Sequence, residues 1–162
     1  VDASSAGNIK PIQVISALLA QAEEFCAPRG CCEYDIYQHY LPLNHVSGAV
    51  EWGFAPFVSG STILLNDRFH PQVVLENVEK YRATMLAGVP AMWSAMFDLP
   101  DFDKYDLSSV EWCMSGAASI KKELVEGSFD ICGNCSNPLG MTELSGFCSM
   151  FGGCCNKERV SL

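Results

Sequence analysis

Short apolar runs of strand length alternate with stretches of helical periodicity, and this alternation restricts the fold of the chain more than any other feature. The strand-like runs cover residues 37–43, 61–65, 83–89, 110–114 and 129–132. Apolar residues at helical spacing lie before and between them, over residues 16–25, 71–81, 90–97 and 119–126. Strands joined by such short helical connections predict a mostly parallel sheet with right-handed crossovers and flanking helices, which is an α/β fold.

Local signals mark where the helices begin and end. Pro71 and Pro90 suit the first position of a helix, where a missing N–H costs nothing. Ser119 is a suitable N-cap for the helix that follows it. Gly30, preceded by proline and arginine, is a typical stop for the first helix.

Composition excludes several classes of protein. The chain has 162 residues, enough for one domain with a sizeable core, and its 49% of hydrophobic residues excludes disorder. A net charge of −9 excludes a nucleic-acid-binding surface, because there is no basic excess to replace phosphate counterions. No apolar run reaches the length of a transmembrane helix, and the N-terminus has neither an initiator Met nor a signal peptide. We therefore expect a cytoplasmic segment of a longer protein.

The nine cysteines allow two interpretations. An odd number cannot pair fully within the chain, which favours reduced and mostly buried thiols in the cytosol. The alternative is a zinc site that staples an interaction domain, formed by Cys132, Cys135, Cys154 and Cys155. The last two are adjacent and lack the spacing typical of zinc ligands, so we favour free thiols.

Residues 137–146 carry the residue types that a phosphate and metal site requires. Gly140 permits a close backbone approach or a positive φ. Thr142 supplies a hydroxyl donor, and Glu143 supplies a hard oxygen ligand of the kind that Mg²⁺ prefers. The alternative is a solvated loop, where Thr and Glu also occur together.

Three segments follow predicted strands directly: His45, residues 115–118 and residues 139–143. Because ligands gather beyond the carboxyl ends of parallel strands, we expect these segments to converge on one crevice. His45 can instead be a helix cap or a packed core residue. The small polar residues 3–8, followed by Lys10, can wrap phosphate oxygens with backbone N–H groups, or can be a frayed terminus.

Four segments resemble the motifs of one enzyme superfamily, in the same order. Residues 41–48 resemble PLFHVxG, residues 87–92 resemble GVPTM, residues 106–118 resemble DLSSLR…SGGAP, and residues 139–143 resemble GYGMTE. On these residues, the stretch 40–147 is similar to the adenylate-forming superfamily. That superfamily includes fatty-acid and aryl-CoA ligases, luciferases and peptide-synthetase adenylation domains.

The resemblance implies an enzyme that activates a carboxylic acid with ATP to an acyl-adenylate and transfers the acyl group to CoA. By position, Thr142 would contact the phosphates and Glu143 would bind Mg²⁺. His45 would border the acyl carboxylate and the thiol entrance. The nucleotide-binding residues would be Gly116, Ala117, Ala118, Leu139, Gly140, Met141, Thr142 and Lys10. The acyl side would be lined by the segment around Trp52 and Phe54 together with Gly88.

The resemblance also divides the chain. Residues 1–36 would be a remnant phosphate-loop region and a helix, residues 37–147 the AMP-binding core, and residues 148–162 a truncated tail. The family's ribose-binding aspartate, hinge and C-terminal lysine are not in this sequence, so we expect an inactive central fragment of the large N-terminal domain. Two alternatives remain: a peptide-synthetase-type adenylation domain, and a degenerate non-catalytic nucleotide-binding module. Leu139 stands where the family carries an aromatic ring that stacks on adenine, and this favours the non-catalytic nucleotide-binding module.

Overall fold

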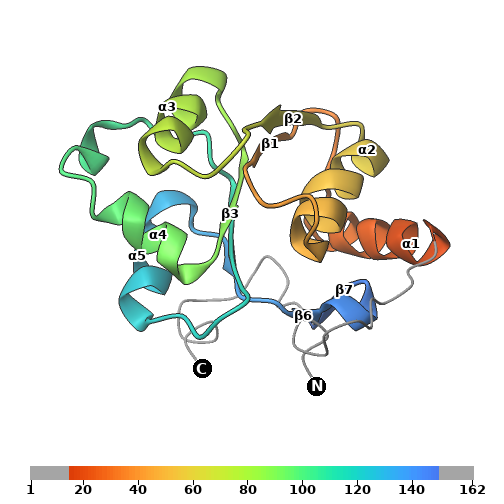
Figure 1. The fold of residues 1–162 in the computed structure, drawn as a ribbon. Helices are drawn as coiled ribbons and strands as arrows, with labels where there is room; N and C mark the ends of the chain where they lie inside the picture. The colour runs from red at the N-terminus through yellow and green to blue at the C-terminus, as the bar shows by residue number, and fades with distance from the viewer. Residues whose placement is uncertain (1–14, 150–162) are drawn as a thin grey trace.

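A five-stranded parallel sheet forms the centre of the structure, a computed structural model that describes residues 15–149 (Figure 1). The strand order is β2-β1-β3-β4-β5, and every neighbouring pair is parallel. The strands are β1 (Ile36–His39), β2 (Thr62–Leu65), β3 (Met85–Gly88), β4 (Trp112–Ser115) and β5 (Cys135–Ser136). The predicted α/β fold with a mostly parallel sheet is confirmed.

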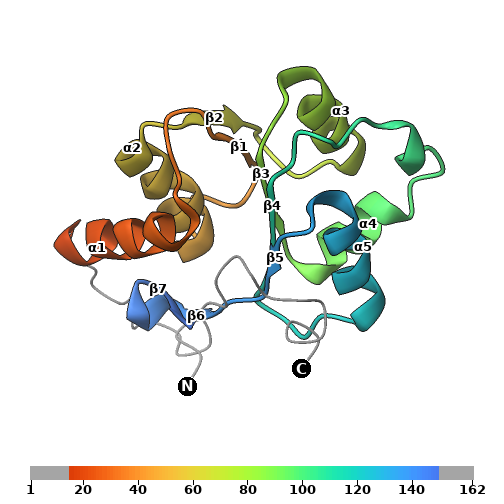
Figure 2. The same cartoon turned by 180° about the vertical axis from the view of Figure 1, so that it is seen from behind.

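Helices cover both faces of the sheet (Figures 1 and 2). One face carries α3 (Pro71–Tyr81), α4 (Pro90–Phe97) and α5 (Lys122–Cys132). The opposite face carries α1 (Ile15–Cys26), the π-helical segment η2 (Ser47–Phe54) and α2 (Ala55–Ser59). Each face of the sheet therefore has its own apolar core, as expected for a parallel sheet whose strands are buried on both sides.

Strand β3 shows how the two cores share one sheet. Leu86 packs into the core beneath α3, α4 and α5, together with Trp93 and Met96. Met85 and Ala87 point the other way, into the core beneath α1 and η2. Because successive side chains of a strand point to opposite faces, an uninterrupted apolar run serves both cores.

The predicted helix starts at the two prolines are confirmed. Pro71 opens α3 and Pro90 opens α4, each after an extended residue. The first helix continues beyond Cys26 as a 3₁₀ turn, η1 (Ala27–Arg29), and Gly30 then takes a left-handed conformation with φ 64°. These signals act locally, through backbone geometry, and so they are legible in the sequence.

Two predictions near the end of the sheet are wrong. Residues 129–132 are not a strand but the last turn of α5, and the strand that follows is only Cys135–Ser136. The helix also starts at Lys122 with Lys121 as its N-cap, later than Ser119. Burial of Val125, Ser128 and Phe129 at helical spacing carries the helix onward until Gly133, at φ 71°, ends it.

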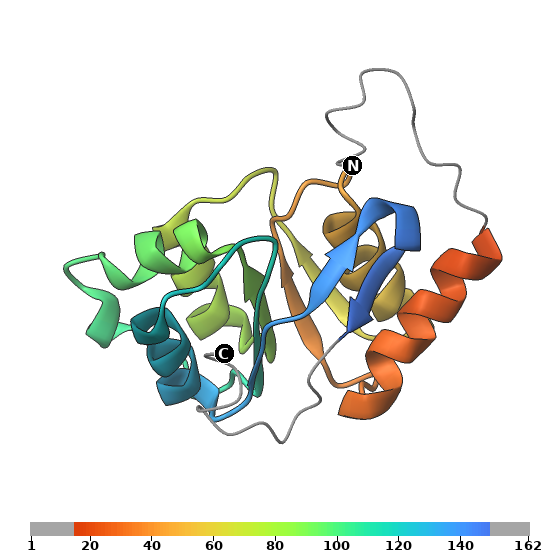
Figure 3. The same cartoon turned by 90° about the horizontal axis from the view of Figure 1, so that it is seen from below.

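The segment predicted as a phosphate and metal loop forms a β-hairpin. Strand β6 (Leu139–Met141) pairs antiparallel with β7 (Gly146–Ser149), and the 3₁₀ turn η4 (Thr142–Leu144) joins them. Strand β7 contacts α1 and η2, so the hairpin lies along the face of the molecule that these helices cover (Figure 3). Phe147 packs its ring 6.0 Å from that of Phe25, which ties the hairpin to the core.

A π-helical segment after β1 brings the chain close to its own preceding loop. The N–H of Ala55 reaches back to the carbonyl of Val50, the five-residue spacing of a π-helix. A Cβ at Gly48 would lie 2.2 Å from the Pro42 carbonyl oxygen, so only glycine fits there. His39 of β1 also contacts this turn, since its Nε2 lies 2.9 Å from the Gly48 carbonyl oxygen.

Phe25 is the centre of an aromatic cluster in the core beneath α1. Its ring lies 5.7 Å from both Trp52 and Trp112 in edge-on geometry, and the Arg29 guanidinium lies 3.8 Å from its centroid. Because Trp112 belongs to β4 and Trp52 to η2, this one side chain joins the sheet, the π-helical segment and α1.

We predict that Phe25→Ala lowers the free energy of unfolding by about 3–5 kcal/mol, the usual cost of deleting a buried ring. Urea unfolding followed by circular dichroism measures the change. The matched control is Ile15→Ala in the same helix, where the side chain is 68% exposed and the expected change is within about 0.5 kcal/mol. Equal effects of the two substitutions would contradict the packing described.

Candidate functional site

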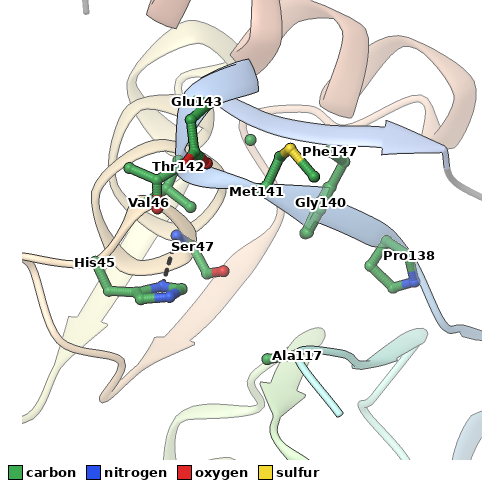
Figure 4. A pocket seen from close by; sticks show the side chains of 11 residues that line it. His45, Val46, Ser47, Ala117, Pro138, Gly140, Met141, Thr142, Glu143 and Phe147 are labelled. Atoms are coloured by element: carbon green, nitrogen blue, oxygen red, sulfur yellow. Dashed lines mark hydrogen bonds between the residues drawn. The ribbon is translucent and has the colours of Figure 1, made fainter. Parts of the chain in front are cut away.

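A cavity of about 540 Å³ lies where the three predicted segments meet (Figure 4). Its lining residues come from the loop after β1, the loop after β4 and the hairpin. They are His45, Val46, Ser47, Ala117, Pro138, Gly140, Met141, Thr142, Glu143, Gly146 and Phe147. The parallel sheet thus brings together segments that are about a hundred residues apart, as the sequence predicts.

A second, more apolar cavity of about 390 Å³ adjoins the first. The two share His45, Ser47, Ala117 and Phe147. The second cavity continues to Gly88 and Val89 after β3, and to Met92 at the start of α4. Strands β1 and β3 are neighbours although β2 separates them in the sequence, so this cavity opens where the chain reverses its direction across the sheet.

His45 lies two residues before the π-helical segment, in an exposed position. Its backbone N–H donates to the Pro42 carbonyl, and its Nδ1 accepts a hydrogen bond from the Ser47 N–H at 3.2 Å. The imidazole is therefore a cap for η2, as one of the two interpretations of this residue predicts. Because Nδ1 accepts, the neutral ring carries its proton on Nε2, where it can donate to a ligand in the cavity.

The loop after β4 is held in a conformation that is rare for its residue types. Ala117 has φ 67°, a left-handed conformation that costs a residue with a Cβ about 1 kcal/mol or more. Pro138 closes over the same loop, since a Cβ at Gly116 would meet its carbonyl oxygen at 3.5 Å. The loop and the chain at Pro138 therefore lie within van der Waals range of each other at the edge of the cavity.

The hairpin places a hydroxyl and a carboxylate together at its tip. Gly140 allows the two strands to pack closely, because a Cβ there would lie 2.7 Å from the Gly146 carbonyl oxygen. Ser145, at φ 62°, closes the turn and donates its N–H to the Thr142 carbonyl at 3.0 Å. The Glu143 side chain is exposed at the cavity.

These donors suit Mg²⁺ bound together with phosphates. Mg²⁺ in such sites takes one or two carboxylates and completes its shell with phosphate oxygens and water. Glu143 and Thr142 provide a hard carboxylate and a hydroxyl side by side. Within residues 15–149, no three His, Cys, Asp or Glu side chains are grouped so that they could hold a metal ion.

Other predicted site residues lie elsewhere. Gly116 and Gly88 line the second cavity, whereas Leu139 and Ala118 line neither of the two. Trp52 is fully buried in the core beneath α1 and donates its indole N–H to the Gln38 carbonyl, and Phe54 packs beside that core. Neither ring lines one of the two cavities, so the predicted acyl lining by these two residues stays a prediction. Lys10 and the run around it lie outside the described residues.

Sequence reasoning missed several residues at the cavity. Ser47, Pro138 and Phe147 line it without having been predicted as site residues. Ser47 lies within the motif at residues 41–48 and Pro138 within the stretch 137–146, so membership of these segments was an available signal. Phe147 had no such signal, because its place depends on the pairing of β7 with β6.

The model of one protein family, described as AMP-binding enzyme, matches residues 7–161. The chain belongs to the AMP-binding enzyme family. The match includes all three segments that line the cavity, together with the sheet that positions them.

Proteins similar in sequence to this AMP-binding family member include CoA ligases. A probable CoA ligase from Humulus lupulus is 37% identical over 89 residues, which are 54% of this chain and 16% of that protein. 4-Coumarate–CoA ligase 4 from Arabidopsis thaliana is 32% identical over 90 residues, 56% of this chain and 16% of that protein. An acyl-CoA ligase from Glarea lozoyensis is 33% identical over 112 residues, 67% of this chain and 20% of that protein. The matched region thus spans about a sixth to a fifth of these relatives.

Solved structures share the fold. The inhibitor-bound N-terminal domain of FACL13 from Mycobacterium tuberculosis has a TM-score of 0.83 at 17% identity, covering 92% of this chain and 37% of that one. A long-chain-fatty-acid–CoA ligase, FadD1 from Archaeoglobus fulgidus, has a TM-score of 0.76 at 20% identity, covering 90% and 31%. Within residues 15–149, no helix is both long and apolar enough to cross a membrane.

Glu51 is a buried carboxyl directly beneath the hairpin. It is fully buried within η2, and neither carboxyl oxygen has a hydrogen-bond partner among the described residues. A Cβ at Gly146 would lie 2.5 Å from the Oε1 of Glu51, so only glycine fits at this position of β7. Burial raises the pKa of Glu51 to about 8, although the nearby Arg29 acts in the opposite direction.

This shift makes stability depend on pH in a defined direction. An unfolded chain releases the Glu51 proton near its ordinary pKa of 4.5, whereas the folded chain holds it until about pH 8. Between these values the folded state binds more protons, so the contribution of Glu51 to stability is complete below pH 4.5 and is lost as pH rises to about 8.

We predict that Glu51→Gln removes a slope of up to about 1.4 kcal/mol per pH unit from the unfolding free energy over this window. Urea unfolding of both variants from acidic to alkaline pH measures the difference. Glu24→Gln, at an exposed position of α1, should leave the slope unchanged. A parallel pH profile for wild type and Glu51→Gln would show that Glu51 is not protonated in the fold.

Proposed function

We propose that the chain is the central part of an AMP-forming acid–CoA ligase, which activates a carboxylic acid with ATP and transfers the acyl group to CoA. One observation carries the proposal. The hairpin with Thr142 and Glu143 faces His45 and the small-residue loop at Ala117 across a single cavity at the ends of the strands (Figure 4). CoA ligases among the sequence relatives support the same reaction.

The nucleotide would lie along the first cavity. Gly116, Ala117 and Ala118 would flank the adenine, because small side chains leave its faces accessible. Leu139, Gly140 and Met141 would pass on the other side and lead to the phosphates at Thr142. No lysine or arginine is among the described lining residues, so positive charge toward the phosphates would come from Lys10 and from Mg²⁺.

Glu143 and Thr142 would position the metal and the phosphates. Glu143 would hold Mg²⁺, which would supply positive charge beside the phosphates. The Thr142 hydroxyl would donate to a phosphate oxygen from a tip that the left-handed Ser145 holds in place. Donors fixed before the reaction stabilise the transition state without a cost of reorganisation.

The acid would occupy the second, apolar cavity. Its lining of Val89, Met92 and Met114 suits a hydrophobic acyl or aryl group, and the 4-coumarate–CoA ligases among the relatives favour an aromatic acid. His45 lies on both cavities, so its Nε2–H can orient the carboxylate toward the α-phosphate. We place the enzyme in the cytoplasm, in keeping with free thiols at the seven described cysteines.

Two other functions remain as alternatives. A peptide-synthetase-type adenylation domain would form the same acyl-adenylate and pass it to a carrier thiol instead of CoA. A degenerate module would bind nucleotide without reaction, which the exposed Leu139 in place of an aromatic ring favours. The three functions differ in measurable steps.

Isotope exchange between pyrophosphate and ATP tests the proposal in the protein extended by its flanking reading frame. A ligase shows exchange that depends on an added aromatic or fatty acid, and forms the thioester when CoA is added. Acid-dependent exchange without thioester would favour the adenylation domain, and ATP binding without exchange would favour the degenerate module. The 162-residue chain alone should show no exchange, because the reaction needs groups that act as a unit.

We predict that Glu143→Gln in the extended protein lowers the rate of adenylation by about a hundredfold or more and weakens its dependence on Mg²⁺. The amide keeps the shape of the side chain but loses the charge that binds the cation. Glu24→Gln on α1 is the control and should change the rate by less than about twofold. A Glu143→Gln variant with wild-type Mg²⁺ dependence would remove Glu143 from the metal site.

A further inference from the structure

Three cysteines meet at the edge of the sheet beneath the site, on elements that no step of the proposed reaction uses. Cys113 lies in β4, Cys132 is the last residue of α5, and Cys135 lies in β5. All three belong to the same apolar core, and Cys113 and Cys135 face each other in the register of the two strands. None of the three lines either of the two cavities.

The sulphur atoms of Cys132 and Cys113 are in direct contact. Their Sγ atoms lie 3.4 Å apart, whereas a disulfide requires about 2.0 Å. Bond formation therefore requires the two sulphur atoms to approach by little more than an ångström. The two residues belong to different elements, so a bond between them would join the end of α5 to the middle of β4.

The two thiols differ in access and in acidity. Cys113 is fully buried, whereas Cys132 is only half-buried. The hydrogen-bonding contact between the two sulphur atoms lowers the pKa of Cys132, and burial together with the same contact raises the pKa of Cys113. When Cys132 holds its proton, it can donate instead to the Asn134 carbonyl at 3.0 Å.

A small molecule can approach Cys132 from the turn that follows it. Gly133 ends α5 in a left-handed conformation, and a Cβ at this residue would meet no atom within 4 Å. The space beside the helix end is therefore open on this side. Cys132 combines partial exposure with a lowered pKa, two properties that favour a reactive cysteine, and has a second thiol within contact distance.

We propose that Cys132 and Cys113 form a dithiol modification site, in which Cys132 attacks a low-molecular-mass disulfide and Cys113 resolves the product into an intrachain disulfide. With oxidised glutathione, the Cys132 thiolate bonds to one glutathione sulphur and the other leaves as a thiolate that takes up a proton. The Cys113 sulphur then attacks Cys132, and the second glutathione leaves in the same way. Two protein thiols and one glutathione disulfide thus become one protein disulfide and two glutathione thiols.

The bond would fix the two strands that lead to the cavity. Strand β4 contains Cys113 and leads to the loop at Gly116 and Ala117. Strand β5 begins only three residues after Cys132 and leads to Pro138. Cys135 stays in the thiol form, because no sulphur partner is recorded as close to it among the described residues as Cys113 is to Cys132. The modification does not depend on the proposed ligase reaction.

Equilibration of the purified 162-residue chain with mixtures of reduced and oxidised glutathione tests the site. After free thiols are blocked with iodoacetamide, peptide mass mapping should show a disulfide between Cys113 and Cys132. Cys135 should be free and should be alkylated once the protein is denatured. The oxidised protein should melt at a higher temperature than the reduced one, and dithiothreitol should reverse the shift. A bond from Cys132 to Cys135, or a Cys132 that stays free while the exposed Cys32 reacts, would overturn the proposal.

Single variants separate the two steps. Cys113→Ala should accumulate one glutathione on Cys132, because the resolving thiol is absent, and Cys113→Ser is the second choice if the cavity destabilises the core. Cys132→Ser, at the half-buried position, should form neither product at this site. Cys32→Ser is the matched control and should oxidise like wild type. Absence of the glutathione adduct in folded Cys113→Ala and Cys113→Ser would refute Cys132 as the attacking thiol.

Discussion

The site depends on one constraint, the reversal of the chain between β1 and β3. Strand β2 pairs with one side of β1, and the next strand, β3, pairs with the other side. The loops after β1 and β3 therefore leave the same end of the sheet and separate from each other there. The second cavity opens at this point, and the loop after β4 and the hairpin complete the first. No single segment forms a binding surface; the order of the strands creates it.

The hairpin is held in place by apolar packing, and its backbone passes close over a buried carboxyl. Phe147 joins the aromatic cluster around Phe25, and Gly146 leaves no room for a Cβ above the carboxyl of Glu51. Thr142 and Glu143 therefore occupy the tip of an element whose base is fixed by the core beneath α1. This arrangement resembles other sites in which a rigid scaffold supports residues on a loop.

Local signals made much of the fold predictable. Pro71 and Pro90 specify helix starts through their own fixed φ, and the alternation of short segments specifies the parallel sheet. Residues 129–132 were assigned wrongly because Phe129 and Ile131 suit a strand or a helix equally, and packing against Phe97 and the sheet decides between them. Glu51 and Phe147 could not be predicted, since their burial depends on the pairing of β6 with β7 and on contacts across the molecule.

The central claim is that three separated segments form one nucleotide site, and hydrogen–deuterium exchange tests it most directly. The protein extended by its flanking reading frame would be labelled with and without ATP and Mg²⁺. We predict that amide exchange slows at residues 45–48, 116–118 and 139–145 together. Exchange in helix α3 should change little, because α3 contributes no residue to the cavity lining. Protection confined to one of these segments, or found only outside them, would contradict the account.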